Sequence, residues 1–209
     1  MNNNIIIRKE EEKDYNQTEQ MTRRAFWNRY KPGSDEHYLV YNLRSDPSYL
    51  PDLSRVAVLG DQVIGCIMYS RAYVLDGDKK HAVVTFGPLC VDPDYQGTGI
   101  GSRLVRETAK TAADAGFPGI IIFGEETYYP RLGFKTCDHF GITTKDGKNF
   151  AAFMAYELQE NTMSAVKGAF HIAEVYGKVS KRLVDEFDRK FPYMEELILP
   201  GQWDQWEIE

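Results

Sequence analysis

The sequence predicts a mixed α/β fold, with a central, mostly antiparallel sheet that contains one parallel pair of strands and has helices on both faces. Two observations predict it. Two apolar, β-branched segments at residues 55–59 and 63–69 flank Gly60-Asp61, which is typical of a tight β-hairpin. A strand pattern at residues 81–91 then leads into a glycine-rich loop, a helical pattern and an apolar strand at residues 120–123, the order of a βαβ unit.

Local sequence patterns show where the predicted elements on either side of these central strands begin and end. Residues 5–8 predict a short strand, and residues 15–26 place apolar side chains at helical spacing before Pro32-Gly33 ends the helix. Ser34 is a suitable N-cap for a second helix. Residues 150–158 predict a further strand, so that one complete domain is expected by residue 158.

The pattern changes after that strand, and we therefore expect a domain at residues 1–158 and a C-terminal extension at residues 159–209. Residues 170–176 fit either a strand or a helical turn. Four apolar residues at four-residue steps predict an amphipathic helix, and these are Val179, Leu183, Phe187 and Phe191. We expect Trp203 and Trp206 to dock the tail onto the domain or onto a second subunit, which keeps a homodimer among the expected assemblies.

The composition argues against several classes of partner. The 209 residues are 43% hydrophobic and carry a net charge of -6 without a cluster of Lys and Arg, so we expect no nucleic-acid partner. The N-terminus lacks the apolar core of a signal peptide, and no apolar run reaches membrane-spanning length, so we expect a cytoplasmic protein without a membrane partner. Cys66, Cys90 and Cys137 are far apart and lack paired Cys or His neighbours, so we expect small buried residues and no metal site.

A glycine-rich loop, Gln96-Gly97-Thr98-Gly99-Ile100-Gly101, lies between a predicted strand and the first turn of a predicted helix. Its glycines let the backbone approach a ligand closely, and the helix N-terminus adds partial positive charge, so the loop favours a pyrophosphate. A P-loop would need Lys and Ser or Thr after the last glycine, where this chain has Ser102-Arg103. A dinucleotide-binding fingerprint would need a different glycine spacing after the first strand of the domain.

A second motif, Tyr128-Tyr129-Pro130-Arg131-Leu132-Gly133-Phe134, follows the short apolar strand. Together the two motifs resemble the GNAT superfamily of N-acetyltransferases, in which an Arg/Gln-x-x-Gly-x-Gly/Ala loop precedes a Tyr-x-x-x-Gly-Phe element. The form with two tyrosines resembles a branch of predicted bacterial acetyltransferases. The resemblance covers about residues 5–158, and it implies a GNAT fold with acetyl-CoA as co-substrate.

The same resemblance implies a cofactor site made by a strand edge and by the loop. The strand edge would pair with the pantetheine arm where two central strands part, and the N–H groups of the loop would hold the pyrophosphate. A backbone N–H near Val91 would stabilise the oxyanion. The implied cofactor-binding residues are Leu89, Cys90, Val91, Gln96, Gly97, Thr98, Gly99, Ile100, Gly101 and Ser102.

The resemblance also implies catalytic roles. Tyr129 is the expected general acid for the departing thiolate, and Tyr128 is expected to pack. The general base stays open between a carboxylate and an ordered water chain, with Glu126 preferred over Glu125, Asp92 and His81. Cys90 has no neighbouring His or Asp that would make it a nucleophile.

The expected function is therefore acetyl transfer from acetyl-CoA to a primary amine of a small molecule. An aromatic stretch at residues 26–30, together with His37 and Tyr38, is expected to contribute to the acceptor pocket. Two alternatives stay open, namely acetylation of a protein lysine or N-terminal amine, and a non-catalytic acyl-CoA sensor.

Overall fold

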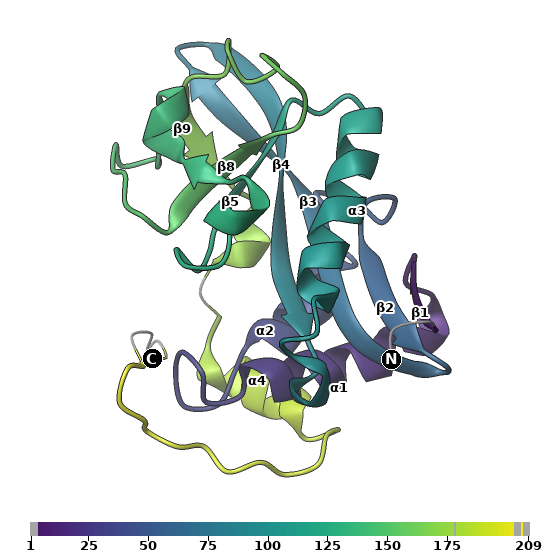
Figure 1. Ribbon diagram of the computed structural model, residues 1–209. Helices are drawn as coiled ribbons and strands as arrows, with labels where there is room; N and C mark the ends of the chain where they lie inside the picture. Colours follow the sequence, from purple (N-terminus) through teal and green to yellow (C-terminus); the bar gives the residue numbers. More distant parts are fainter. Residues whose placement is uncertain (1–3, 178, 203–205, 207–209) are drawn as a thin grey trace.

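The computed structural model describes residues 4–177, 179–202 and 206. Within them a single nine-stranded sheet has the order β1-β2-β3-β4-β5-β8-β6, and β9 pairs with both β3 and β7 (Figure 1). The strands are β1 (Ile5–Arg8), β2 (Arg55–Leu59), β3 (Gln62–Asp76), β4 (Lys79–Val91), β5 (Gly119–Phe123), β6 (Lys135–Thr136), β7 (Ile142–Thr143), β8 (Phe153–Glu157) and β9 (Gly168–His171). The mixed α/β fold expected from the sequence is confirmed.

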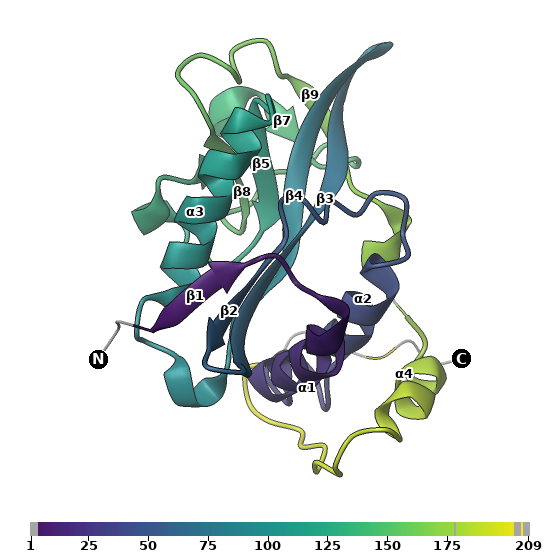
Figure 2. The same cartoon turned by 90° about the vertical axis from the view of Figure 1, so that its right-hand side faces the viewer.

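Helices cover both faces of the sheet. Figure 2 shows α3 (Ile100–Asp114) on one face, with α1 (Tyr15–Phe26) and α2 (Glu36–Leu43) on the other. The apolar stripe of α3 explains its position, because its buried residues lie three or four apart along the helix and pack on the sheet. No helix within the described ranges is long and apolar enough to cross a membrane.

The feature that positions the site is the divergence of β4 and β5. These strands run parallel, but their recorded pairing is confined to Val84 with Ile120. Farther along, β4 bulges, because Tyr69 pairs with Phe86 whereas Ile67 pairs with Leu89. Beyond the paired residues the two strands diverge (Figure 1), and we call the place where the strands of the sheet part the opening. Such an opening leaves main-chain groups of β4 available to a ligand.

The segment that we expected to be an extension begins as part of the sheet. β9 pairs with β3 through Phe170 and Val74, and the neighbouring 3-10 turn η5 (Glu174–Tyr176) places Tyr176 against Gly87 of the β4 bulge. The chain then leaves the sheet and forms α4 (Lys181–Asp188), which lies beside α1 and α2 (Figure 2). The described part of the chain after residue 158 is therefore in contact with the body along much of its length.

The predicted apolar face of this last helix is partly wrong. Val184 is the buried residue of α4, with 1% of its surface exposed, whereas Leu183 is 37% exposed. Val179 lies before the helix, and Phe191 lies beyond its end. The reason is geometric, since each four-residue step overshoots a full helical turn by about 40°, and residues at such steps drift off one face. Trp206 docks on the body, through its Nε1–H to Pro32 O at 2.9 Å, and Trp203 lies outside the described residues.

Candidate active site

The glycine-rich loop lies at the end of β4, beside the opening, and is tied to the opposite face of the sheet. Asp92, which is buried, accepts a hydrogen bond from Asp94 N at 3.0 Å and begins the turn that leads into the loop. Arg24 of α1 donates to Asp92 at 2.8 Å and to Asp94 at 3.1 Å. The buried end of this ion pair anchors the loop to α1.

The backbone of the loop is shaped to receive an anion. Gly97 and Gly99 have φ angles of 75° and 88°, in the left-handed region that favours glycine. A β-carbon added at either position would meet no atom within 4 Å, so the space next to both glycines is open. No described group accepts a hydrogen bond from the N–H of Gly97, Thr98 or Gly99, and the first N–H groups of α3 have no helical partner. These donors fit a pyrophosphate.

The side chains of the loop bond mainly to the loop itself. Thr98 Oγ1 donates to Tyr95 O at 2.6 Å, and Gln96 Nε2 donates to Val91 O at 3.1 Å. These bonds hold the loop in shape and leave its main-chain donors free for a ligand. Ser102 differs, because its hydroxyl lies 3.2 Å from the hydroxyl of Tyr128 across the opening.

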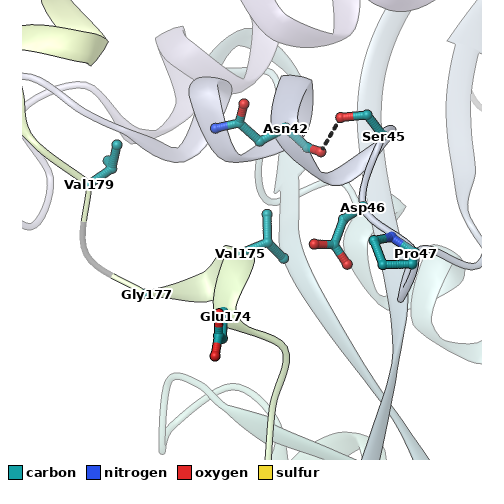
Figure 3. Close-up of a pocket in the computed structure, with 8 residues that line it drawn as sticks. All are labelled: Asn42, Ser45, Asp46, Pro47, Glu174, Val175, Gly177 and Val179. Atoms are coloured by element: carbon teal, nitrogen blue, oxygen red, sulfur yellow. Dashed lines mark hydrogen bonds between the residues drawn. The ribbon is translucent and has the colours of Figure 1, made fainter.

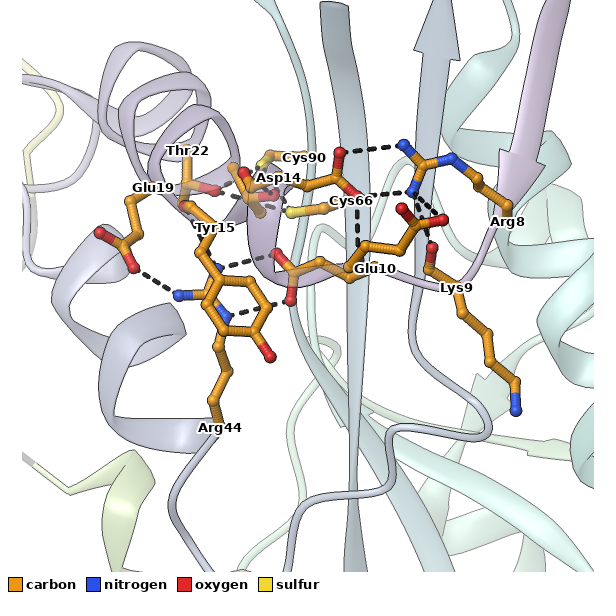
Figure 4. A network of polar contacts seen from close by, with 12 residues as sticks. Arg8, Lys9, Glu10, Asp14, Tyr15, Glu19, Thr22, Arg44, Cys66 and Cys90 are labelled. Atoms are coloured by element: carbon orange, nitrogen blue, oxygen red, sulfur yellow. Dashed lines mark hydrogen bonds and ion pairs between the residues drawn. The ribbon is translucent and has the colours of Figure 1, made fainter. Parts of the chain in front are cut away.

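The strand segment before the loop offers its backbone rather than its side chains. The Cys90 side chain points under α1, where Sγ lies 3.5 Å from both Cys66 Sγ and Thr22 Oγ1 (Figure 4). Burial raises the pKa of the Cys90 thiol well above its usual value, which disfavours a nucleophilic thiolate. Cys66, Cys90 and Cys137 are all free and buried, as expected from the sequence.

Tyr129 is held in an aromatic cluster at the wall of the opening. It is 9% exposed, and its ring contacts those of Phe86, Tyr128 and Phe134. No described residue exchanges a hydrogen bond with its hydroxyl. Burial raises the pKa of the Tyr129 phenol well above its usual value, so the hydroxyl keeps its proton at neutral pH and is available as a donor.

Tyr128 does more than the packing expected from the sequence. Its hydroxyl reaches Ser102 at the start of α3, and its ring lies under the guanidinium of Arg131 at 4.3 Å. Sequence reasoning missed this contact because neighbouring residues in a turn point in different directions, and only the tertiary structure decides which one faces the loop. The small residue at position 101 was the available signal, since any β-carbon there would meet the Tyr128 hydroxyl.

The α1–α2 loop contacts the segment that follows β5. Glu125, which follows β5, accepts hydrogen bonds at 3.3 Å from both Arg29 and Tyr30 of that loop. Glu126 is exposed and has no hydrogen bond or ion pair to another described residue. The structure therefore brings Glu125 to the loop, whereas the sequence analysis preferred its neighbour Glu126.

Other expected residues lie elsewhere. His37 and Tyr38 face α4, because His37 Nε2 lies 2.5 Å from Asp188 and Tyr38 packs on Phe187. The Asp92 carboxylate already accepts a hydrogen bond from Arg24. His81 lies near the start of β4, at the end of the strand away from the glycine loop. Neither Asp92 nor His81 is placed to act as the base at the opening.

A separate hollow lies between the end of α2 and η5. Its volume is about 390 Å³, and it is lined by Asn42, Ser45, Asp46, Pro47, Glu174, Val175, Gly177 and Val179 (Figure 3). The hollow includes neither the glycine loop nor Tyr129, so its size does not make it the catalytic site. No cluster of three or more His, Cys, Asp or Glu side chains suited to a metal ion occurs among the described residues.

The family follows from comparison with known proteins. Residues 13–134, more than half of the chain, match the family model of the acetyltransferase (GNAT) family. The chain belongs to the GNAT family. The match includes the glycine loop and ends at Phe134, the last residue of the tyrosine motif, so the tail that follows α4 lies outside it.

Individual relatives agree with this placement. The chain is 36% identical over 104 residues to the uncharacterized N-acetyltransferase YjhQ of Escherichia coli, which covers 50% of this chain and 58% of YjhQ. It is 27% identical over 143 residues to the uncharacterized N-acetyltransferase YhbS of the same organism, covering 68% of this chain and 84% of YhbS. The matched part thus spans little more than half the length of YjhQ.

Solved structures share the fold. The crystal structure of Escherichia coli YhbS in complex with CoA superposes with a TM-score of 0.75 at 26% identity, covering 85% of this chain and 94% of that one. A GNAT family acetyltransferase from Brucella melitensis, solved in complex with acetyl-CoA, superposes with a TM-score of 0.65 at 28% identity, covering 82% and 97%. Both likenesses extend beyond the two motifs to most of the chain.

Proposed function

We propose that this chain is an N-acetyltransferase that transfers the acetyl group of acetyl-CoA to a primary amine of a small molecule. The observation that carries the proposal is the glycine loop beside the opening between β4 and β5, with N–H groups that have no partner in the described part of the chain. The two structural relatives solved with CoA and with acetyl-CoA support the choice of co-substrate. The thioester of acetyl-CoA supplies the electrophilic carbonyl.

The fit of the chain to this co-substrate is given by its backbone. The main chain of Leu89, Cys90 and Val91 would pair with the amide groups of the pantetheine arm, because β5 does not pair with β4 along these residues. The N–H groups from Gln96 to Gly101 would hold the pyrophosphate, and the Ser102 hydroxyl is close enough to the loop to add a donor. A main-chain N–H near Val91 is the proposed oxyanion donor.

Tyr129 is the proposed general acid. A buried phenol with a raised pKa stays protonated, and a hydroxyl with no hydrogen-bond partner among the described residues can donate to a leaving thiolate. Proton donation of this kind contributes about a hundredfold or more to a rate. Tyr128 is the control position, since its hydroxyl is already engaged with Ser102.

The proposed base is a carboxylate on the segment after β5. Glu126 stays the candidate from the sequence, and the contacts of Glu125 with Arg29 and Tyr30 make it the alternative on the same segment. An ammonium must lose a proton before its nitrogen attacks, and a carboxylate beside the opening both attracts the cation and accepts that proton. The two glutamates and the net charge of -6 suit a cationic amine.

The test is release of free CoA thiol from acetyl-CoA in the presence of polyamines, amino acids, aminoglycosides or peptides. We expect turnover with at least one small amine, and loss of that turnover in the Tyr129→Phe variant. Turnover with peptides alone would contradict the small-molecule acceptor. Tight binding of acetyl-CoA without turnover of any amine would contradict the enzymatic proposal and would indicate a sensor.

A further inference from the structure

Asn28 is the second residue of the loop between α1 and α2, which spans residues 27–35. It has a φ of 59°, a left-handed conformation that asparagine tolerates better than most residues. Its side-chain Oδ1 accepts hydrogen bonds from Gly33 N at 2.8 Å and from Leu197 N at 3.0 Å. One amide group thus closes the loop on itself and binds it to the C-terminal tail.

The tail makes further bonds to the same part of the loop. The carbonyl of Glu195 accepts from Asn28 Nδ2 at 2.9 Å and from Trp27 Nε1 at 2.8 Å. Gln202 Nε2 donates to Asn28 O at 3.0 Å. The tail therefore satisfies polar groups that a loop without secondary structure would otherwise leave to water.

The tail is itself fastened on both sides of these contacts. Arg23 of α1 donates to Asp188 Oδ1 at 3.1 Å and to Pro192 O at 3.0 Å, before the tail reaches the loop. After the loop, Trp206 donates to Pro32 O at 2.9 Å. Between them, Lys181 of α4 pairs with Glu196 at 2.9 Å. These contacts hold the tail from Asp188 to Gln202, and Trp206 beyond it, against α1 and the α1–α2 loop.

The other side of the loop reaches the candidate active site. Arg29 and Tyr30 come directly after Asn28, and both donate to Glu125 in the segment that leads to Tyr129. These two bonds are long and partly exposed, so they are weak. Asn28 directly precedes Arg29, so the bonds that hold Asn28 in place help to fix the position of Arg29 beside Glu125.

We propose that Asn28 is a positioning residue for the acceptor amine, and that the tail at residues 192–202 braces the acceptor side of the active site through it. The inference rests on the proposed acetyl transfer and deepens it. The tail lies outside residues 13–134, the part of the chain that matches the GNAT family model. The cofactor loop is anchored separately, through Arg24 and Asp92, and does not depend on the tail.

The experiment compares two asparagines that share a backbone conformation. Asn28→Gly keeps the left-handed φ accessible and removes only the side-chain bonds. Asn161 has a φ of 64° on the turn after β8, and Asn161→Gly is the matched control. Gln202→Ala weakens the brace from the tail, without any change in the loop. The acceptor is the best amine of the panel described above.

We expect Asn28→Gly to raise KM for the amine by about tenfold, since removal of hydrogen bonds worth about 1.4 kcal/mol changes an equilibrium constant tenfold. Gln202→Ala should raise it less, and Asn161→Gly should leave it unchanged. The dissociation constant of acetyl-CoA should stay the same in all three variants. An unchanged amine KM in Asn28→Gly, or an equal loss of acetyl-CoA affinity, would overturn the inference.

Hydrogen exchange separates this inference from the proposed function. In Asn28→Gly and Gln202→Ala, the amides of residues 27–33 and 124–129 should exchange faster, whereas those of residues 96–102 should not. Unchanged exchange at residues 124–129 would overturn the brace whether or not the wild-type protein acetylates an amine. A wild-type protein that binds no acetyl-CoA would count against the proposed function, and the exchange result would still decide the role of the tail.

Discussion

The hydroxyl of Tyr128 lies 2.8 Å from the point where a β-carbon on Gly101 would stand. That separation is shorter than real β-carbon contacts, so the ring of Tyr128 and the first turn of α3 fit together only because position 101 has no side chain. Glycine within a helix otherwise costs stability. The effect of a side chain at position 101 on stability should therefore change sign with the residue at position 128.

Gly101→Ala should destabilise the wild-type protein, because the new methyl displaces the Tyr128 hydroxyl and breaks its bond to Ser102. In a Tyr128→Phe background the same substitution should stabilise by roughly 0.5–1 kcal/mol, the usual advantage of alanine over glycine in a helix. Urea unfolding of the four proteins measures both effects. Equal effects of Gly101→Ala in the two backgrounds would show that the residues do not interact.

Binding of acetyl-CoA should depend on Gly99. The co-substrate at about 100 times its dissociation constant should stabilise the wild-type protein by about 2.7 kcal/mol and raise its melting temperature. Gly99→Glu adds a bulky, negatively charged side chain where the pyrophosphate would bind, and should abolish this rise in melting temperature. Gly99→Ala imposes the same backbone strain without the charge, and should retain part of it. A full shift in Gly99→Glu would contradict the assignment of the loop.

The two tyrosines should differ in catalysis. Tyr129→Phe removes the proposed acid and keeps the ring in its aromatic cluster, so kcat should fall by about a hundredfold while the affinity for acetyl-CoA barely changes. Tyr128→Phe should instead weaken binding of acetyl-CoA with little change in kcat, because its hydroxyl bonds to Ser102. Steady-state kinetics and calorimetric titration distinguish the two. A crippled Tyr128→Phe enzyme beside a fully active Tyr129→Phe enzyme would reverse the assignment.

Two neighbouring residues test the docking of α4. Val184 is 1% exposed, so Val184→Ala should cost about 2 kcal/mol of unfolding free energy, from lost burial and the cavity left behind. Leu183 is 37% exposed, and Leu183→Ala should change stability by no more than about 0.5 kcal/mol. Thermal and urea unfolding provide the comparison. The opposite ranking would restore the face predicted from the four-residue spacing.

The free energy of unfolding should depend on pH through the carboxyl group of Asp14. Arg8 donates to its carboxylate, with Nη2 at 2.9 Å from Oδ1, and this contact holds the pKa of Asp14 below its ordinary value. A lowered folded-state pKa contributes stability that is present above the unfolded value of about 3.9 and is lost as pH falls through the folded-state pKa. Unfolding free energy should therefore fall more steeply below about pH 4 in the wild-type protein than in Asp14→Asn. Parallel pH profiles would exclude this role.

Several features could be predicted from the sequence because local rules determine them. The glycine loop was recognisable because glycine adopts the left-handed φ angles found at Gly97 and Gly99 more readily than other residues, and because the loop begins a helix. Alternating and helical periodicities predicted the strands and α3, since a side chain must face the core at regular intervals. Tyr129 was recognisable by its spacing to Gly133-Phe134, which is a local motif.

The tertiary structure decided the features that join distant parts of the chain. The meeting of Glu125 with Arg29, of Tyr128 with Ser102, and of Asn28 with Leu197 each brings together residues whose separation in sequence carries no periodic signal. The buried face of α4 was also decided there, because its orientation is set by the surface of α1 and α2 that it covers. Sequence patterns record which side chains a local element can bury, whereas contacts between elements depend on how the elements pack.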